Sequence, residues 1–364
     1  MQRTLPIFCF MVAMTLLLIT TSASADLHNV YIATVPVGNL GNGGEGSGEN
    51  YGGDGPDRIC GSVDYPYNIG KYEVTAGQYT EFLNAVAGVD TYSLYNTAMW
   101  SSSNGCKIER FEGSGTVEDP YRYRVAADYA NRPVNFVSWA DAARFANWMH
   151  NGQPTGEQDL TTTEDGSYFL NGAVSSVELQ AVVREPDATW VIPSEDEWYK
   201  AAYHKNDGVT SNYWDYPTCS DIRPSNDLID PDPGNNANFE DDGYTIDSPY
   251  WRTEYGEFEN SASCYGTYDQ AGNVWELNES IIGEGRSTRG GAWDAHIQLR
   301  DYLHAADRAS WAHPWSDEAD HIGFRLAEIV HWPPCDLRGD LDLDGDVDLA
   351  DLAALLAHYG ETCD

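Results

Sequence analysis

Six aspartates near the C-terminal end of the 364-residue chain have the spacing of a calcium-binding loop. From residue 339 the sequence reads GDLDLDGDVDLADLAALLAHY, which places carboxylates at loop positions 1, 3, 5, 9 and 12 and a glycine at position 6. Alternate side chains of such a loop converge on one hard cation, the glycine allows a sharp turn, and position 7 supplies its backbone carbonyl. The residues expected to bind Ca2+ are Asp340, Asp342, Asp344, Asp346, Asp348 and Asp351.

An acidic, solvated tail is the alternative interpretation of these aspartates. Against it, Leu352, Leu355 and Leu356 follow the loop with helical spacing. Loop position 12 carries Asp351, where an EF-hand usually has a bidentate glutamate. This variant resembles the calcium-binding repeat of dockerin modules, which implies a cohesin-like or cell-surface partner. Dockerins carry two such repeats and this chain has one, so the resemblance leaves the partner open.

The first residues indicate export. Arg3 precedes an apolar run over 5–19, and Ala23 and Ala25 form a small-x-small cleavage site before Asp26. We therefore expect a signal peptide over 1–25 and a secreted, periplasmic or cell-surface product. The run is too short for a membrane-spanning helix, and no later stretch is long and apolar enough, so no membrane span is expected.

Removal of this segment takes Cys9 and leaves six cysteines in an oxidising compartment, where disulfides form. Two of the six bracket the calcium loop and are expected to pair. The other four allow three pairings, of which sequence proximity favours one. The expected pairs are Cys335 with Cys363, Cys60 with Cys106, and Cys219 with Cys264.

The composition limits the fold and the partners. A net charge of −38 repels polyanions, so nucleic acid is not an expected partner, and it suits divalent cations. Twelve Trp, 23 Tyr and 34 Gly predict a loop-rich domain held together by aromatic packing. We expect one large domain over 27–330, a proline-containing linker over 331–338, and the calcium module over 339–364.

Short helices are predicted where a capping residue precedes a helically spaced apolar set. The three capping patterns are Thr75–Gln78, Ser138–Asp141 and Ser194–Glu197. Glu195 and Glu197 belong to the third pattern, and we interpret them as charges that stabilise a helix N-terminus rather than as an acid/base pair. A strand is expected over 27–37, followed by an exposed loop over 38–57.

Six sequence blocks, read in order, resemble the formylglycine-generating enzyme family, also called the sulfatase-modifying-factor family. The blocks are IGKYEVTAGQYTEFLNAVA (69–87), RPVNFVSWADAARFANWM (132–149), WVIPSEDEWYKAAY (190–203), YGTYDQAGNVWE (265–276), RGGAW (289–293) and GFRLA (323–327). The resemblance implies an α+β fold of the C-type-lectin-like class, with few helices around small twisted sheets.

The family's oxidases hold copper(I) through two cysteines that follow the paired glycines, because that metal selects soft thiolates. In this sequence those positions are Ala295 and Arg300, so copper and formylglycine synthesis are not expected. The expected function is binding of a glycan or peptide in the former active-site groove, lined by Trp293, Asp294, Arg300 and Arg325. The alternative interpretation of two of these residues is that Trp293 packs in the core and Arg325 is a buried structural partner. The alternative is an enzyme of this family with altered metal or substrate chemistry.

The resemblance also implies structural calcium sites. In the first, the Asp269 and Glu276 carboxylates would bind the ion together with the Gly272 and Val274 carbonyls, and the alternative is an ordinary hairpin. A second set would use Asn238 and Asp242 with the carbonyls of residues 239 and 244.

Overall fold

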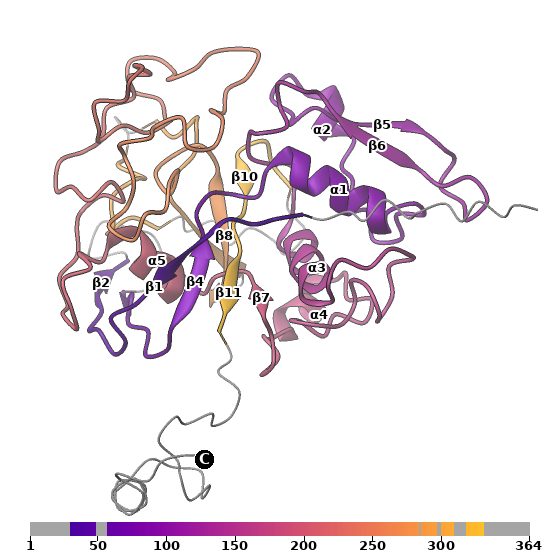
Figure 1. Ribbon diagram of the computed structural model, residues 1–364, viewed down its shortest axis with the longest axis horizontal. Helices are drawn as coiled ribbons and strands as arrows, with labels where there is room; N and C mark the ends of the chain where they lie inside the picture. The colour runs from indigo at the N-terminus through magenta and orange to yellow at the C-terminus, as the bar shows by residue number, and fades with distance from the viewer. Residues whose placement is uncertain (1–29, 49–56, 284, 297–299, 309–317, 331–364) are drawn as a thin grey trace, which may run out of the picture.

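The computed structural model describes residues 30–48, 57–283, 285–296, 300–308 and 318–330. The expected signal peptide, linker, calcium module and Cys335–Cys363 pair lie outside these residues. Within them the fold is mixed α+β, as the sequence predicted (Figure 1).

Short strands form four small sheets, and long loops connect them. The strands are β1 (Thr34–Val37), β2 (Glu45–Ser47), β3 (Arg58–Cys60), β4 (Tyr67–Gly70), β5 (Ile108–Glu112), β6 (Arg122–Val125), β7 (Trp190–Val191), β8 (Trp275–Ile282), β9 (Gly285–Arg289), β10 (Ile322–Gly323) and β11 (Ala327–Ile329). The helices are α1 (Ala76–Val86), α2 (Ala98–Ser101), α3 (Trp139–His150), α4 (Ser176–Ala181) and α5 (Glu195–Tyr203).

The largest sheet has the order β1-β4-β11-β7 and joins the two ends of the domain. Its pairs are antiparallel, with Ala327 of β11 opposite Ile69 of β4. The second sheet has the order β10-β8-β9, in which β10 lies parallel to β8. In the view of Figure 1, α1, α3 and α4 lie to the right of β4 and β11, and α5 lies to their left. Three sequence blocks contribute to these two sheets: the block 69–87 begins in β4, the block 265–276 ends in β8, and the block 323–327 runs from β10 to β11.

The three predicted helix starts are confirmed. Each capping residue accepts a hydrogen bond from the third helical residue, and that residue's side chain accepts one from the cap's backbone N–H. The sequence prediction missed α4, which begins with the same device at Ser175 and Glu178.

The N-terminal segment differs from the prediction in two ways. Of the strand expected over 27–37, the structure forms β1 over its last four residues, which pair with β4. The exposed loop expected over 38–57 contains β2, whose Ser47 is buried. Pairing with β3 supplies hydrogen bonds to this stretch, which has no hydrophobic pattern of its own.

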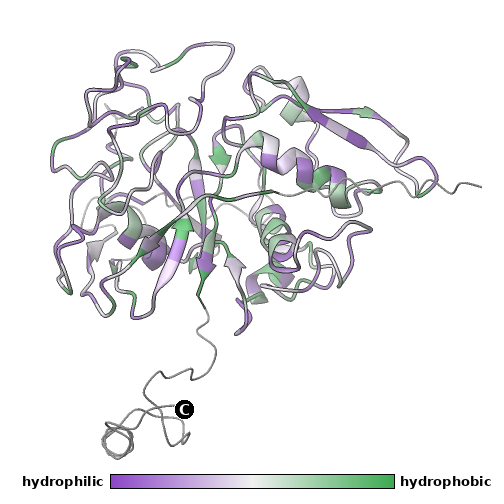
Figure 2. Ribbon diagram, in the orientation of Figure 1, coloured by the Kyte–Doolittle hydropathy of each residue, from purple (hydrophilic) through white to green (hydrophobic). Residues whose placement is uncertain are grey.

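Aromatic side chains fill the main core, as the composition predicted. Phe82 of α1 lies 5.2 Å from Phe145 and 5.3 Å from Trp148 of α3, measured between ring centroids. Phe145 in turn lies 5.5 Å from Phe324, which precedes β11. The predicted apolar faces of α1 and α3 therefore pack against each other and against the central sheet. Figure 2 shows hydrophobic residues on β10 and at the end of β4.

One of the two disulfides expected in this part of the chain is present. Cys219 and Cys264 are bonded. The expected Cys60–Cys106 pair is wrong, because both are buried free thiols. Cys60 ends β3 and packs with a tyrosine cluster on α5, whereas the Cys106 thiol faces the Asn135 carbonyl. Sequence proximity failed here because the chain between them builds α1 and α2 and carries them to different parts of the core.

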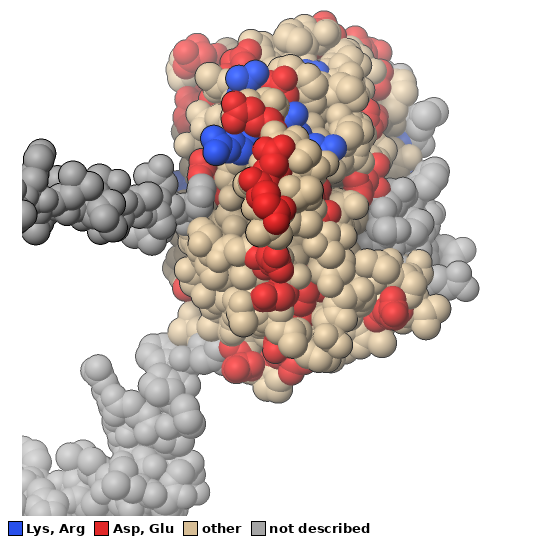
Figure 3. All heavy atoms as spheres, turned by 90° about the vertical axis from the view of Figure 1, so that its right-hand side faces the viewer, with Lys and Arg blue, Asp and Glu red and all other residues tan. Residues whose placement is uncertain are grey.

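The charge of the chain is visible on its surface. On the face seen in Figure 3, Asp and Glu form a band, while Lys and Arg gather in the upper part of this face. No helix among the described residues has the length and hydropathy to cross a membrane.

Candidate functional site

A glycine turn places Trp293 in the interior. β9 ends at Arg289, and Gly290 and Gly291 follow with φ of +98° and +75°, a region that side chains rarely adopt. A Cβ on Gly290 would also lie 2.8 Å from the Gln270 carbonyl oxygen. The turn is held in place because the Trp293 N–H donates to the Asn273 carbonyl at 3.0 Å.

Three aromatic rings form a cluster that reaches the surface. Trp293 is 5% exposed, and its ring centroid lies 5.1 Å from that of Trp251 and 5.7 Å from that of Tyr244. Tyr244 and Trp251 lie 5.0 Å apart, edge to face. Tyr244 is 39% exposed and is therefore the member that a ligand would meet first.

Carboxylates and histidines surround this cluster. His321 Nδ1 lies 3.6 Å from Asp294 Oδ2 and 3.3 Å from Asp320 Oδ1, and His296 Nε2 lies 3.7 Å from Glu240 Oε1. The Trp293 indole N–H donates to the Asp320 carbonyl at 3.4 Å. All of these acidic and histidine side chains are partly exposed.

Three carboxylates act electrostatically on Tyr244. Burial raises the pKa of the Tyr244 hydroxyl, and Glu240, Asp294 and Asp247 raise it further. Burial also raises the pKa of Asp294, which His321 lowers and Asp320 raises. An exposed aromatic ring bordered by several carboxylates is suited to a cationic group. We call Tyr244, Trp251 and Trp293, with these bordering carboxylates, the aromatic–acidic surface.

The two positions that hold copper in the family's oxidases carry no sulfur. Ala295 is buried, and Arg300 forms an ion pair with Asp307. Neither side chain is a thiolate ligand, so these residues do not fit copper(I). Cys264, the thiol that is nearest upstream in sequence, is bonded to Cys219.

The four predicted groove residues do not line one groove. Trp293 and Asp294 belong to the aromatic–acidic surface, and Arg300 is engaged by Asp307. Arg325 is fully buried, donates to both carboxylate oxygens of Glu276 at 2.5 and 2.6 Å, and is structural. Three cavities of 440–650 Å³ in the described part of the chain are lined by other residues.

The first expected calcium set lies in a buried group of charges. Glu276 accepts from Arg325 and, at 2.8 Å, from the Trp198 indole N–H. Burial raises the pKa of Asp269 to about 6. Burial also raises the pKa of Glu73 well above its usual range, and the neighbouring Asp269 and Glu276 add to that shift. Oε1 of Glu73 has no hydrogen-bond partner among the described residues.

Charge balance decides whether this group suits a cation. Glu73, Asp269 and Glu276 carry three negative charges if ionised, and Arg325 supplies one positive charge, which leaves an excess of two. A divalent cation or bound protons would neutralise it. As the side chains lie, no group of three or more His, Cys, Asp or Glu in the described ranges converges on a metal position. The carboxylates are hard oxygen donors of the kind that calcium takes, and Glu73 is a member of this group that the sequence prediction missed.

The second expected set is held by hydrogen bonds. The buried Asn238 side chain donates to the Trp251 carbonyl and to Asn273 Oδ1, both at 3.0 Å, while Asp242 is exposed. The carbonyl of residue 239 accepts from the Asn226 amide at 3.3 Å and from the hydroxyl of residue 245 at 3.1 Å. The Asn226 amide also donates to the carbonyls of residues 241 and 243, so a side-chain N–H group occupies the middle of this loop.

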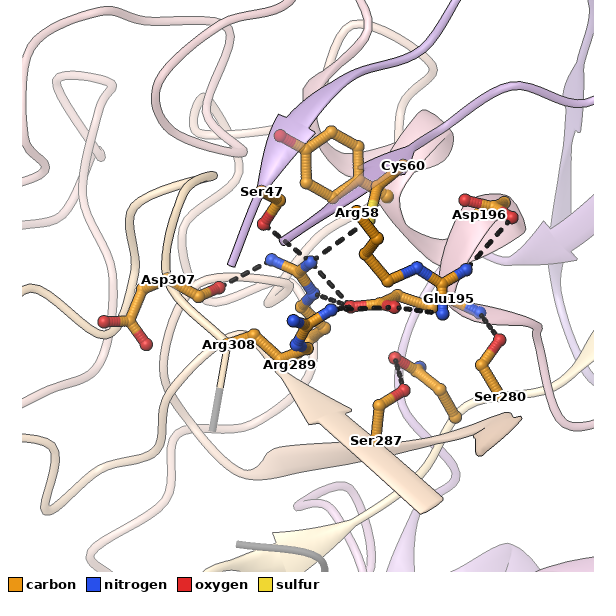
Figure 4. A network of polar contacts seen from close by, with 12 residues as sticks. Ser47, Arg58, Cys60, Glu195, Asp196, Ser280, Ser287, Arg289, Asp307 and Arg308 are labelled. Atoms are coloured by element: carbon orange, nitrogen blue, oxygen red, sulfur yellow. Dashed lines mark hydrogen bonds and ion pairs between the residues drawn. The ribbon is translucent and has the colours of Figure 1, made fainter. Parts of the chain in front are cut away.

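A second buried ion-pair network centres on Glu195 (Figure 4). Its carboxylate accepts from Arg289 at 2.6 and 2.8 Å, and Arg58 and Arg308 approach it to 3.2 and 3.4 Å. Burial alone would raise the pKa of Glu195, but the three arginines hold it below its usual range. Glu197 pairs in the same way with Arg184 at 2.8 Å. Both glutamates are therefore structural, as the helix-start pattern indicated, although their arginine partners could not be predicted from that pattern.

Comparison with known proteins identifies the family. The model of the sulfatase-modifying factor enzyme 1-like domain (FGE-sulfatase) matches residues 28–330. Curated protein sequences contain no match.

Solved structures resemble the chain at low identity. Treponema denticola variable protein 1 is 18% identical, with 84% of this chain and 97% of that chain covered and a TM-score of 0.49. CarF is 20% identical, with coverage of 83% and 99% and a TM-score of 0.48. PvdO from Pseudomonas aeruginosa is 17% identical, with coverage of 76% and 85% and a TM-score of 0.42. Because the family model spans most of the sequence and the motif residues of that match build the core described above, the chain belongs to the FGE-sulfatase family.

Proposed function

We propose that the main domain is a binding module rather than an oxidase. The observation that carries this proposal is the aromatic–acidic surface. It contains Trp293 and Asp294, which directly precede Ala295, the first of the two lost cysteine positions. The surface combines rigid aromatic rings with charges that orient a ligand, and it supplies no sulfur for copper.

The ligand of this surface is a peptide segment that carries lysine or arginine. Of the glycan and peptide expected from the sequence, the peptide fits better because three carboxylates, Glu240, Asp294 and Asp247, act electrostatically on Tyr244. Cations bind over tyrosine and tryptophan faces, and nearby carboxylates add to that attraction. The arginine next to the cluster in sequence, Arg252, is buried and donates to the Asn104 and Asp320 carbonyls.

A positional-scanning hexapeptide library, read by fluorescence polarisation on the full chain, tests the ligand class. Selection of lysine or arginine, lost in Tyr244→Ala and weakened by salt, is the expected result. Equal binding of acidic and basic peptides would argue against the proposal.

A mass-spectrometric assay tests the absence of oxidase activity. A peptide with the sulfatase-type cysteine is incubated with the protein, copper and oxygen, and it should remain a thiol. Conversion to the aldehyde above a no-enzyme control would support the alternative of an enzyme with altered chemistry.

We also propose that the chain is exported, that residues 339–364 bind Ca2+ like a dockerin repeat, and that structural calcium occupies the Glu73–Asp269 region. The spacing of the aspartates supports the C-terminal site, and the excess of two charges supports the internal one. Calorimetric titration of the chelator-treated chain should show a calcium-binding event that Asp344→Ala removes. Sequencing of the mature protein should find Asp26 at its N-terminus.

A further inference from the structure

A cleft of about 610 Å³ lies between the N-terminal strand region, the start of α1 and the loop around residue 255. Tyr31, Tyr72 and Tyr255 line it together with Glu81 and Asn131. None of its lining residues belongs to the aromatic–acidic surface. Its volume is in the range of small-ligand sites, so it is large enough for one to three sugar rings.

The tyrosines form a platform with free polar ends. The Tyr72 and Tyr255 ring centroids lie 4.8 Å apart, and Tyr255 is 42% exposed. Tyr268 extends the stack behind Tyr72 at 5.5 Å. Among the described residues, no group hydrogen-bonds to the hydroxyls of Tyr31, Tyr72 or Tyr255. The cleft thus offers flat apolar faces and three phenol groups that can each donate and accept a hydrogen bond.

The walls of the cleft are already ordered. Gln78 accepts from the Thr75 N–H at 2.9 Å and donates to the Tyr31 carbonyl at 2.9 Å, which ties the N-terminal segment to the first turn of α1. The Tyr255 N–H donates to the Asn131 carbonyl at 2.9 Å. A site that is ordered before binding loses less entropy when a ligand enters.

Few charged groups lie at the cleft, in contrast to the chain as a whole. Glu73 and Glu81 are among the lining residues; the Glu73 carboxyl is buried, which raises its pKa, and the Glu81 carboxylate is exposed. Behind the lining, Lys71 places its ammonium 5.4 Å from the Tyr72 ring centroid and 5.2 Å from that of Tyr268. The charge of −38 disfavours a polyanion, whereas an exposed carboxylate can accept hydrogen bonds from the hydroxyls of a neutral ligand.

We propose that this cleft binds a neutral saccharide, with a sugar ring packed on the exposed ring of Tyr255 and its hydroxyls bonded to the phenols, Asn131 and Glu81. Amphipathic tyrosine rings pack against the C–H face of a sugar and bond its hydroxyl edge, and they lose little side-chain entropy in doing so. The site is independent of the peptide surface proposed above, so each can fail without the other.

Calorimetric titration of the full chain with a panel of neutral oligosaccharides of two to four units, containing α- and β-linked glucose and galactose, tests the proposal. We expect saturable binding of at least one member. Tyr255→Ala should weaken it on the order of tenfold, as expected for loss of one aromatic contact. Tyr244→Ala, an exposed tyrosine on the other surface, is the matched control and should leave it unchanged.

Glu81→Gln tests the polar part of the cleft without removing its bulk. We expect weaker saccharide binding and an unchanged melting temperature, because Glu81 is exposed. Absence of saturable binding across the panel, or equal affinity in wild type and Tyr255→Ala, would overturn the proposal. Tyr255-dependent binding of choline in preference to its neutral isostere 3,3-dimethylbutanol would also overturn it, because the cleft would then be a cation site.

Discussion

Carboxylates differ in burial and in bonding partners between two regions of this domain. In the core, Glu195 and Glu276 are fully buried and each is bonded to arginine, so neither is available to a ligand. Around Tyr244, Glu240 and Asp294 are partly exposed and face histidines at 3.6 to 3.7 Å. The buried pairs come from the sequence blocks that identify the family, and the exposed acids mostly do not. The family motifs therefore supply the buried ion pairs of the scaffold, while the exposed acids belong to the surface that we propose as the binding site.

The largest expected effect is on the buried pair of Glu276 and Arg325. Glu276→Ala should lower the free energy of unfolding by about 3–5 kcal/mol, because it leaves a guanidinium buried without its ion partner. Urea unfolding followed by tryptophan fluorescence measures the change. The loss measured in chelator reports the ion pair alone, and any additional loss in calcium reports the role of Glu276 in the proposed calcium site.

The double variant Glu276→Leu with Arg325→Leu tests whether the unpaired buried charge causes the loss of stability. Replacement of both charges by apolar groups removes the unpaired charge, so it should recover much of the stability lost in Glu276→Ala. If the double variant is less stable than the single one, the pair is not the cause of the loss.

The substitution Asp269→Asn distinguishes two ways of neutralising the buried carboxylates, by a bound calcium ion or by bound protons. If calcium neutralises the two excess charges, a concentration of 100 times its Kd stabilises the domain by about 2.7 kcal/mol. Asp269→Asn should remove this calcium dependence of the melting temperature. A wild-type melting temperature that is equal in calcium and in chelator would show that protons neutralise the group instead.

Asp141 gives a smaller, pH-dependent effect on the scaffold. Burial raises the pKa of this α3 capping residue to about 6, and its neighbour Arg144 pairs with Glu164 instead. The folded state thus binds this proton more tightly than the unfolded state does. Stability from this group is present below about pH 4 and is lost as pH rises through about 6, by roughly 1–3 kcal/mol. The difference in unfolding free energy between wild type and Asp141→Asn, followed from pH 4 to 7, measures it.

The smallest stability effect is expected at the aromatic–acidic surface. Tyr244→Ala removes an exposed ring and should change the unfolding free energy by about 0.5 kcal/mol or less. Tyr255→Ala is the matched comparison, since both rings are similarly exposed. A loss of several kcal/mol in Tyr244→Ala would mean that the cluster is part of the core rather than a ligand surface.

The sequence predicted what depends on local pattern. Capping residues at 75, 138 and 194 identified the helices, and the apolar faces of α1 and α3 are buried as their spacing required. Contacts between distant segments could not be predicted, because one sequence carries no signal for which arginine meets which glutamate. For this reason Arg325 was placed in a groove although it lies in the core, and Cys60 was paired with Cys106. Glu73 was missed because it lies about 200 residues before its partner Asn273.

The most direct test of peptide binding at the aromatic–acidic surface is titration of the selected lysine-containing peptide into wild type, Tyr244→Ala and Asp294→Asn, followed by fluorescence polarisation. If the aromatic–acidic surface binds the peptide, both substitutions should weaken binding about tenfold or more at low salt, without loss of stability. Equal affinity in all three proteins would contradict the claim that the former catalytic surface of this family serves here as a binding site.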